Sequence, residues 1–138
     1  MRRRILALLA CGVLLPLASC KVSFSIAGVW DFTLSYKIVG GSTVNEDVAY
    51  ELTGDESAGT VSMVPDPGGF SAGTYQVSGS RFTASFTFGR PMLMNSNSYD
   101  GQINDADGTM AGTMSGQALL NGAISSTWTG TFTAAKRD

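Results

Sequence analysis

The sequence predicts an all-β domain, either an antiparallel up-and-down barrel or a strongly coiled meander of about eight strands. Seventeen glycines and frequent turn signals divide the chain into short segments. In several of these segments apolar side chains alternate with serine and threonine, the period of a strand that is buried on one side. No amphipathic stretch of helical period extends beyond a few residues. The connections are short, and short connections favour antiparallel neighbours.

Three segments show the alternation most clearly: residues 29–39, 81–88 and 123–134. Weaker strands are expected at 44–53, 60–64, 73–78, 98–103 and 109–119. Residue parity then assigns one apolar inward face to the sheet. The inward side chains expected from the three clear strands are Trp30, Phe32, Leu34, Tyr36, Ile38, Phe82, Ala84, Phe86, Phe88, Ile124, Trp128 and Phe132.

Two predicted turns support this face. A two-residue type II′ turn with Gly79 in its first central position pairs Val77 with Phe82. A four-residue loop at 105–108 pairs Ile103 with Met110, and Tyr99 with Met114.

A third turn, at Asn121-Gly122, allows two registers. A two-residue loop places Leu119 opposite Ile124 but sets a serine against Trp128. A three-residue loop that ends in Gly122 pairs Met114 with Trp128, and Met110 with Phe132. The second register buries more apolar surface, and we expect it.

The first twenty residues have the build of an export signal. Arginines at 2–4 precede an apolar stretch at 5–17 that is too short to span a membrane, and small residues then lead to a cysteine. Leu17-Ala18-Ser19-Cys20 resembles the lipobox of bacterial lipoproteins. This resemblance implies cleavage before Cys20 and acylation of its thiol. It divides the chain into a signal peptide (1–19), a lipidated anchor with a short tether (20–27) and a barrel domain (28–138). The alternative is a secreted protein whose cysteine is there by coincidence.

The same resemblance predicts where the protein resides. Acyl chains on Cys20 would attach it to a membrane of the cell envelope. Lys21 follows the cysteine where an aspartate would favour the inner membrane. In a host with two membranes we therefore expect the periplasmic face of the outer membrane.

Composition excludes several kinds of chemistry. The chain has no histidine, which is the commonest general acid–base group. With Cys11 lost in the signal and Cys20 acylated, no thiol is left, so the usual zinc ligands are missing. Nine basic and eleven acidic residues give a net charge of −2, and removing the three signal arginines lowers it to −5. No basic patch favours nucleic acid. We expect no catalytic residues, no metal and no cofactor.

Gly28-Val29-Trp30, at the start of the first strand, resembles the Gly-x-Trp motif of lipocalins and related calycins. In that family the tryptophan closes one end of the barrel, and a basic residue after the last strand packs on it. The resemblance implies this role for Trp30, with Lys136 or Arg137 as its partner.

The leading hypothesis is a non-enzymatic protein that binds a small apolar ligand inside a lipocalin-like barrel. Residues 89–98 form the longest segment without a strand pattern. Their methionines could form a lid or portal at the open end of the barrel, but a segment that merely caps the core there is the interpretation we favour. The candidate ligand-binding residues are Tyr36, Phe86, Phe88, Met92, Leu93, Met94 and Met114. The alternative is a protein-binding envelope module, an inhibitor or assembly partner, whose barrel is filled by its own side chains.

Two acidic clusters are weaker candidates. Residues 104–108 begin like a calcium loop, but Asp-Gly between two strands is also an ordinary hairpin turn, which we favour. Glu46, Asp47 and Glu51 could serve glycoside hydrolysis, although carboxylates on a solvated strand face are common. Parity points Glu46 inward near the barrel rim.

Replacing Cys20 by serine should abolish acylation, because serine offers no thiol for the thioether. Radiolabelled palmitate fed to expressing cells measures this. Cys11→Ser is the matched control and should keep the label. Label retained by the Cys20→Ser protein would contradict the lipobox prediction.

Overall fold

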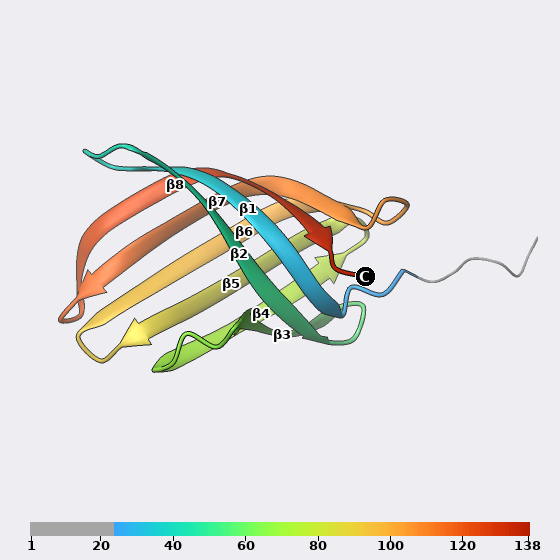
Figure 1. Ribbon diagram of the computed structural model, residues 1–138, viewed down its shortest axis with the longest axis horizontal. Coiled ribbons are helices and arrows are strands. Elements are labelled where there is room, and N and C mark those ends of the chain that lie inside the picture. The colour runs from blue at the N-terminus through green and yellow to red at the C-terminus, as the bar shows by residue number, and fades with distance from the viewer. Residues whose placement is uncertain (1–23) are drawn as a thin grey trace, which may run out of the picture.

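The structure is a computed structural model that describes residues 24–138, and these form one closed eight-stranded barrel (Figure 1). The expectations for the signal peptide, Cys20 and Lys21 lie outside the described residues. Within them, no helix is long and apolar enough to cross a membrane. The strands are β1 (Gly28–Ile38), β2 (Thr43–Gly54), β3 (Ala58–Val64), β4 (Phe70–Ser78), β5 (Arg81–Arg90), β6 (Leu93–Asn104), β7 (Thr109–Leu120) and β8 (Ala123–Lys136).

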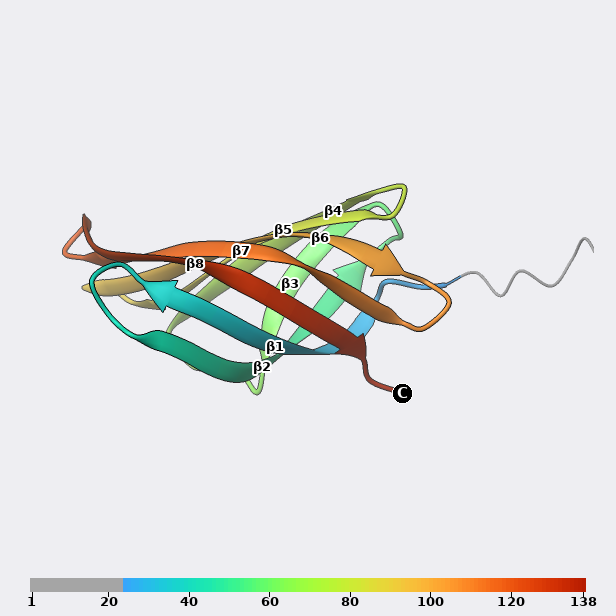
Figure 2. The same cartoon turned by 90° about the horizontal axis from the view of Figure 1, so that it is seen from above.

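The barrel is up-and-down, which is one of the two arrangements that the sequence predicts. Each strand pairs antiparallel with the next, and β8 pairs with β1 to close the sheet. The turns therefore fall into two groups at opposite ends. We call the end with the β2–β3, β4–β5 and β6–β7 turns the base, where the chain enters and where it ends (Figures 1 and 2). The other end, with the β1–β2, β3–β4, β5–β6 and β7–β8 turns, is the tip.

The apolar face points into the barrel. Trp30 and Phe82 are fully buried, and serine, threonine and charged side chains alternate with the buried residues along the outside. This is the reverse of a barrel whose outer face contacts lipid. The largest fully buried side chains are Trp30, Tyr50, Tyr75, Phe32, Phe82, Phe86, Phe132, Leu34 and Leu52.

Two of the predicted registers are confirmed. Val77 pairs with Phe82 across a turn in which Gly79 has a φ of 60°. Ile103 pairs with Met110 across the loop at 105–108, and Tyr99 pairs with Met114.

The register predicted between β7 and β8 is wrong. Asn121 and Gly122, with φ angles of 51° and 81°, form a two-residue turn that pairs Leu119 with Ile124. A bulge then leaves Ser125 without a partner, and its hydroxyl donates to the Ala118 carbonyl over 3.1 Å. Beyond the bulge Trp128 lies opposite Gly116 and Phe132 opposite Gly112. The bulge restores the inward face for both aromatic residues but turns Ile124 outward, where it is 63% exposed.

The candidate lid at residues 89–98 is not an irregular segment. β5 continues to Arg90 and β6 begins at Leu93, so a two-residue turn of Pro91 and Met92 joins them. The strand pattern is hidden in the sequence because Asn95 and Asn97 occupy inward positions that are normally apolar. Asn97 is buried and accepts a hydrogen bond from the Trp128 indole, 2.9 Å away.

A second polar contact lies in the core. The hydroxyls of Tyr50 and Tyr99 are 2.9 Å apart and form a hydrogen bond between two otherwise apolar side chains. Within the described residues, no buried side-chain nitrogen or oxygen atom lacks a partner. The interior is therefore packed with aromatic rings, and the polar side-chain atoms buried among them have hydrogen-bond partners.

Trp30→Ala should lower the free energy of unfolding by about 3–5 kcal/mol, because it opens a cavity in a filled core. That loss is a large share of the stability of a small domain. Urea titration followed by circular dichroism measures it. Met92→Ala, at a position that is 65% exposed, is the control and should change stability by less than about 0.5 kcal/mol. Equal effects of the two substitutions would contradict this packing.

Candidate functional site

The base is closed in part by the segment that precedes β1. Ile26 is 2% exposed, and its carbonyl accepts a hydrogen bond from the Trp30 indole over 2.9 Å. The Phe24 ring meets Trp30 edge to face, with 6.0 Å between the ring centroids. Residues 24–27, which the sequence assigns to the tether, thus fold under the first strand and pack against the core.

The two basic residues after the last strand have different positions. Lys136 pairs with Trp30 in the register and faces the base. Its ammonium donates to the Ser25 carbonyl over 2.6 Å and lies 5.6 Å from the centre of the Phe24 ring. Arg137 forms an ion pair with Asp31, away from the tryptophan. Of the two candidates, Lys136 thus has the position beside Trp30, and its ammonium contacts the segment that covers the base.

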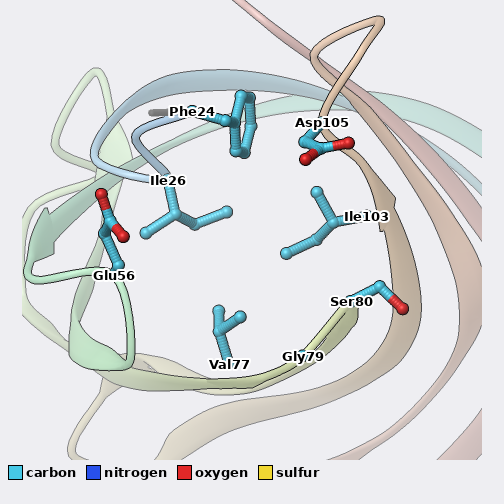
Figure 3. A pocket seen from close by; sticks show the side chains of 8 residues that line it. All are labelled: Phe24, Ile26, Glu56, Val77, Gly79, Ser80, Ile103 and Asp105. Atoms are coloured by element: carbon cyan, nitrogen blue, oxygen red, sulfur yellow. The ribbon is translucent and has the colours of Figure 1, made fainter. Parts of the chain in front are cut away.

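A cavity of about 360 Å³ lies in the mouth of the barrel at the base (Figure 3). Side chains from the N-terminal segment, β4 and β6 surround the opening, and the β2–β3, β4–β5 and β6–β7 turns complete its rim. Four apolar side chains line it: Phe24, Ile26, Val77 and Ile103. Glu56, Gly79, Ser80 and Asp105 supply the polar part of the lining.

Hydrogen bonds hold the rim in place. The Asp55 carboxylate accepts from the Ser57 amide and hydroxyl and from the Ala58 amide, which fixes the turn that carries Glu56. These contacts hold the pKa of Asp55 below its usual value. The Val77 amide donates to the Ser57 carbonyl over 2.7 Å, which ties this turn to β4.

The opposite rim is tied in the same way. The Ile103 amide donates to the Ser80 carbonyl over 2.7 Å, and the Ser80 hydroxyl donates to Gln102. The Lys136 amide donates to the Gly108 carbonyl over 2.9 Å, which joins the β6–β7 turn to β8. The mouth is therefore preformed by the barrel itself.

The residues predicted to bind a ligand do not come together at this cavity. Phe86 and Met114 are buried in the core. Tyr36 and Phe88 are half-buried near the tip, where Phe88 stacks on Phe86. Met92 and Leu93 are exposed, and Met94 is half-buried on the outer side of β6. None of the seven lines the cavity at the base.

The exposed large hydrophobic side chains of the described residues all lie at the tip. They come from the turns or from the strand ends beside them, and from all four hairpins at this end. We call this group the apolar tip: Val39, Phe70, Met92, Leu93, Leu120 and Ile124. Several large apolar side chains exposed at one end of a domain favour an interaction surface there.

A polar pair lies just inside the tip. The Tyr36 hydroxyl donates to the Glu46 carboxylate over 3.1 Å, and Glu46 is on the inward face, opposite Leu34. Burial, with the Glu46 charge second, raises the pKa of Tyr36 to about 12. Asp47, by contrast, is on the outer face, where it accepts from the Thr33 hydroxyl. The three carboxylates on β2 therefore do not form one site.

The 104–108 loop is a hairpin turn. The Asn104 amide donates to the Asp107 carboxylate over 2.7 Å, and Gly108 has a φ of 64°. Between residues 24 and 138, no group of three or more histidine, cysteine, aspartate or glutamate side chains is arranged to hold a metal ion.

Compared with known proteins, the chain matches no protein-family model and no curated protein.

Sequence reasoning missed the base cavity because Phe24 and Ile26 fell in the expected tether. A signal was present: two apolar residues at a spacing of two lie directly before Gly28-Val29-Trp30. The sequence places Val77 and Ile103 on the inward face. It does not show that they face the same space, because this depends on closure of the barrel and not only on the pairing of adjacent strands.

Stability should fall as pH rises above about 10, because tyrosines titrate there in the unfolded chain. Burial raises the pKa of Tyr99 and Tyr50, as it does that of Tyr36. The folded state therefore keeps the phenolic protons at a pH where the unfolded chain loses them. The stabilisation from these tyrosines is complete below pH 10 and is lost progressively as the pH rises above it. Urea midpoints between pH 8 and pH 11 measure the decline. The Tyr50→Phe/Tyr99→Phe double variant should show a shallower slope, and an unchanged slope would contradict this explanation.

Proposed function

We propose that this protein is a non-enzymatic binding protein of the cell envelope, anchored through Cys20, which holds a small ligand with an apolar body in the mouth of its barrel. The observation that carries the proposal is the cavity of about 360 Å³ at the base, whose volume falls in the range of small-molecule sites. A lipocalin-like site deep in the barrel is not supported, because aromatic side chains fill the interior.

The lining supports binding rather than catalysis. Phe24, Ile26, Val77 and Ile103 offer an apolar surface from three separate segments. The carboxylates of Glu56 and Asp105 lie on opposite sides of the opening (Figure 3). The Ser80 hydroxyl of the lining donates to Gln102 and not to a carboxylate, so it lacks the general base that would make it a nucleophile.

A second candidate function is supported by the apolar tip. Six large hydrophobic side chains exposed at one end favour a partner protein that presents an apolar surface of its own. If Cys20 is acylated, the chain enters the barrel at the base, so the tip would point away from the membrane and meet such a partner. The filled interior is consistent with this function as well.

A fluorescent apolar probe distinguishes the two sites. Phenylnaphthylamine, whose emission rises in apolar surroundings, is titrated into the purified chain. Val77→Phe places a ring in the base cavity and should weaken probe binding about tenfold or more. Val39→Phe adds the same ring at the tip, at a position that is 75% exposed, and should leave binding unchanged.

Ser80→Phe keeps the test valid if Val77→Phe disturbs packing, because Ser80 is exposed on the rim. Binding that survives both base substitutions, but is lost in Leu93→Ser/Ile124→Ser, would overturn the base site and place the probe on the apolar tip.

A further inference from the structure

We propose that the base cavity selects an organic cation: a ligand with an apolar body and an ammonium head, such as an alkylamine. The inference rests on the proposed function and adds the charge of the ligand to it. Its basis is the combination of four apolar walls with two carboxylates that lie on opposite sides of the same opening.

The geometry gives the two parts of such a ligand different places. Ile26, Val77 and Ile103 project toward the centre of the opening, where an alkyl or aryl body would lie (Figure 3). Glu56 stands beside Ile26, and Asp105 is across the opening near Phe24 (Figure 3). A head group at the rim would thus meet a carboxylate on either side while the body stays on apolar surface.

The electrostatics of the base favour a positive head. The turns at 55–57 and 105–108 hold four carboxylates and no basic residue. Asp55 is engaged in its own turn, and Asp107 in a hydrogen bond with Asn104. The ion pairs recorded between residues 24 and 138 join other carboxylates, Asp100 and Asp31, to Arg81 and Arg137.

Of the basic side chains that residues 24–138 place at the base, Arg81 and Arg137 are held in these ion pairs, and the Lys136 ammonium is engaged as well. It donates to the Ser25 carbonyl and lies over Phe24. This contact also shows that an ammonium is accommodated beside the Phe24 ring, the aromatic residue of the cavity. Because Lys136 already occupies this face, a second cation would find its partners in the carboxylates of Glu56 and Asp105.

An anionic amphiphile is disfavoured by the same groups. A fatty-acid carboxylate at the rim would lie near Glu56 and Asp105, and like charges at short range raise the free energy of the complex. Both carboxylates are exposed at the rim, so added salt screens this difference.

Three ligands of equal chain length test the inference: octylammonium, octanol and octanoate, each titrated into the purified chain by calorimetry. Octylammonium should bind about tenfold or more tighter than octanoate, and its advantage should shrink as salt is raised. The Glu56→Gln/Asp105→Asn variant should lose this preference while its affinity for octanol is unchanged. Asp66→Asn removes one charge from the β3–β4 turn at the tip and is the control that should keep the preference.

The outcomes separate the two proposals. Equal binding of all three ligands at the base overturns the cation inference and leaves the apolar site standing. No binding of any of them overturns both. A preference for octylammonium that persists in the Glu56→Gln/Asp105→Asn variant would also overturn the inference, because these carboxylates would not be its source.

A further experiment distinguishes a lipid head group from a free amine as the natural source of the ammonium group. Vesicles of phosphatidylethanolamine, whose head groups carry an ammonium, are added to the complex with octylammonium. Displacement of octylammonium supports a lipid head group as the natural carrier, and its retention supports a free amine.

Discussion

Aromatic rings fill this barrel because glycines on the neighbouring strands leave room for them. Six glycine–aromatic pairs lie directly opposite each other in the register: Gly59–Tyr75, Gly73–Phe86, Gly101–Phe82, Gly112–Phe132, Gly116–Trp128 and Gly130–Tyr36. A Cβ atom at Gly59 would lie 2.6 Å from a ring carbon of Tyr75, and one at Gly73 would lie 2.7 Å from a ring carbon of Phe86. Both distances are shorter than van der Waals contact allows.

This pairing explains how so many rings fit inside eight strands. An eight-stranded barrel has an interior just wide enough for its side chains. Large residues on every strand would overfill it, and small residues throughout would leave it hollow. Setting a glycine opposite a ring in five of the eight strand pairs meets both limits. The high glycine content is therefore a packing requirement of the interior as well as a turn signal.

Filling the interior also determines where function can reside. A barrel packed through its middle offers ligands and partners its two ends and its outer face. The outer face is mostly polar, whereas both ends depart from this pattern. The base has a cavity between apolar walls with carboxylates at its rim, and the tip exposes six large hydrophobic residues. The two proposals for function correspond to these two ends.

The architecture could be predicted from sequence because alternation and turn chemistry are local. Gly79 fixed one hairpin, and its register followed from a count of residues. The β7–β8 register failed at Ser125, because a bulge changes the count without leaving a composition signal. The start of β6 was missed because a buried asparagine is not expected at an inward strand position. The side-chain oxygen of Asn97 accepts a hydrogen bond from the Trp128 indole, and this partner is on a strand that is distant in sequence.

The site was less predictable because it depends on closure. Phe24 and Ile26 acquire a role only when the segment before β1 folds under Trp30, and Val77 and Ile103 face the same space only because strands β4 and β6 end at the same rim. Phe24 is the fourth residue after Cys20, and four residue steps span at most about 14 Å. If Cys20 is acylated, the base cavity therefore lies close to the membrane surface. There it would meet amphiphiles at the interface before they reach the rest of the envelope, and the packed barrel above it would keep the apolar tip a full strand length away from the same lipid.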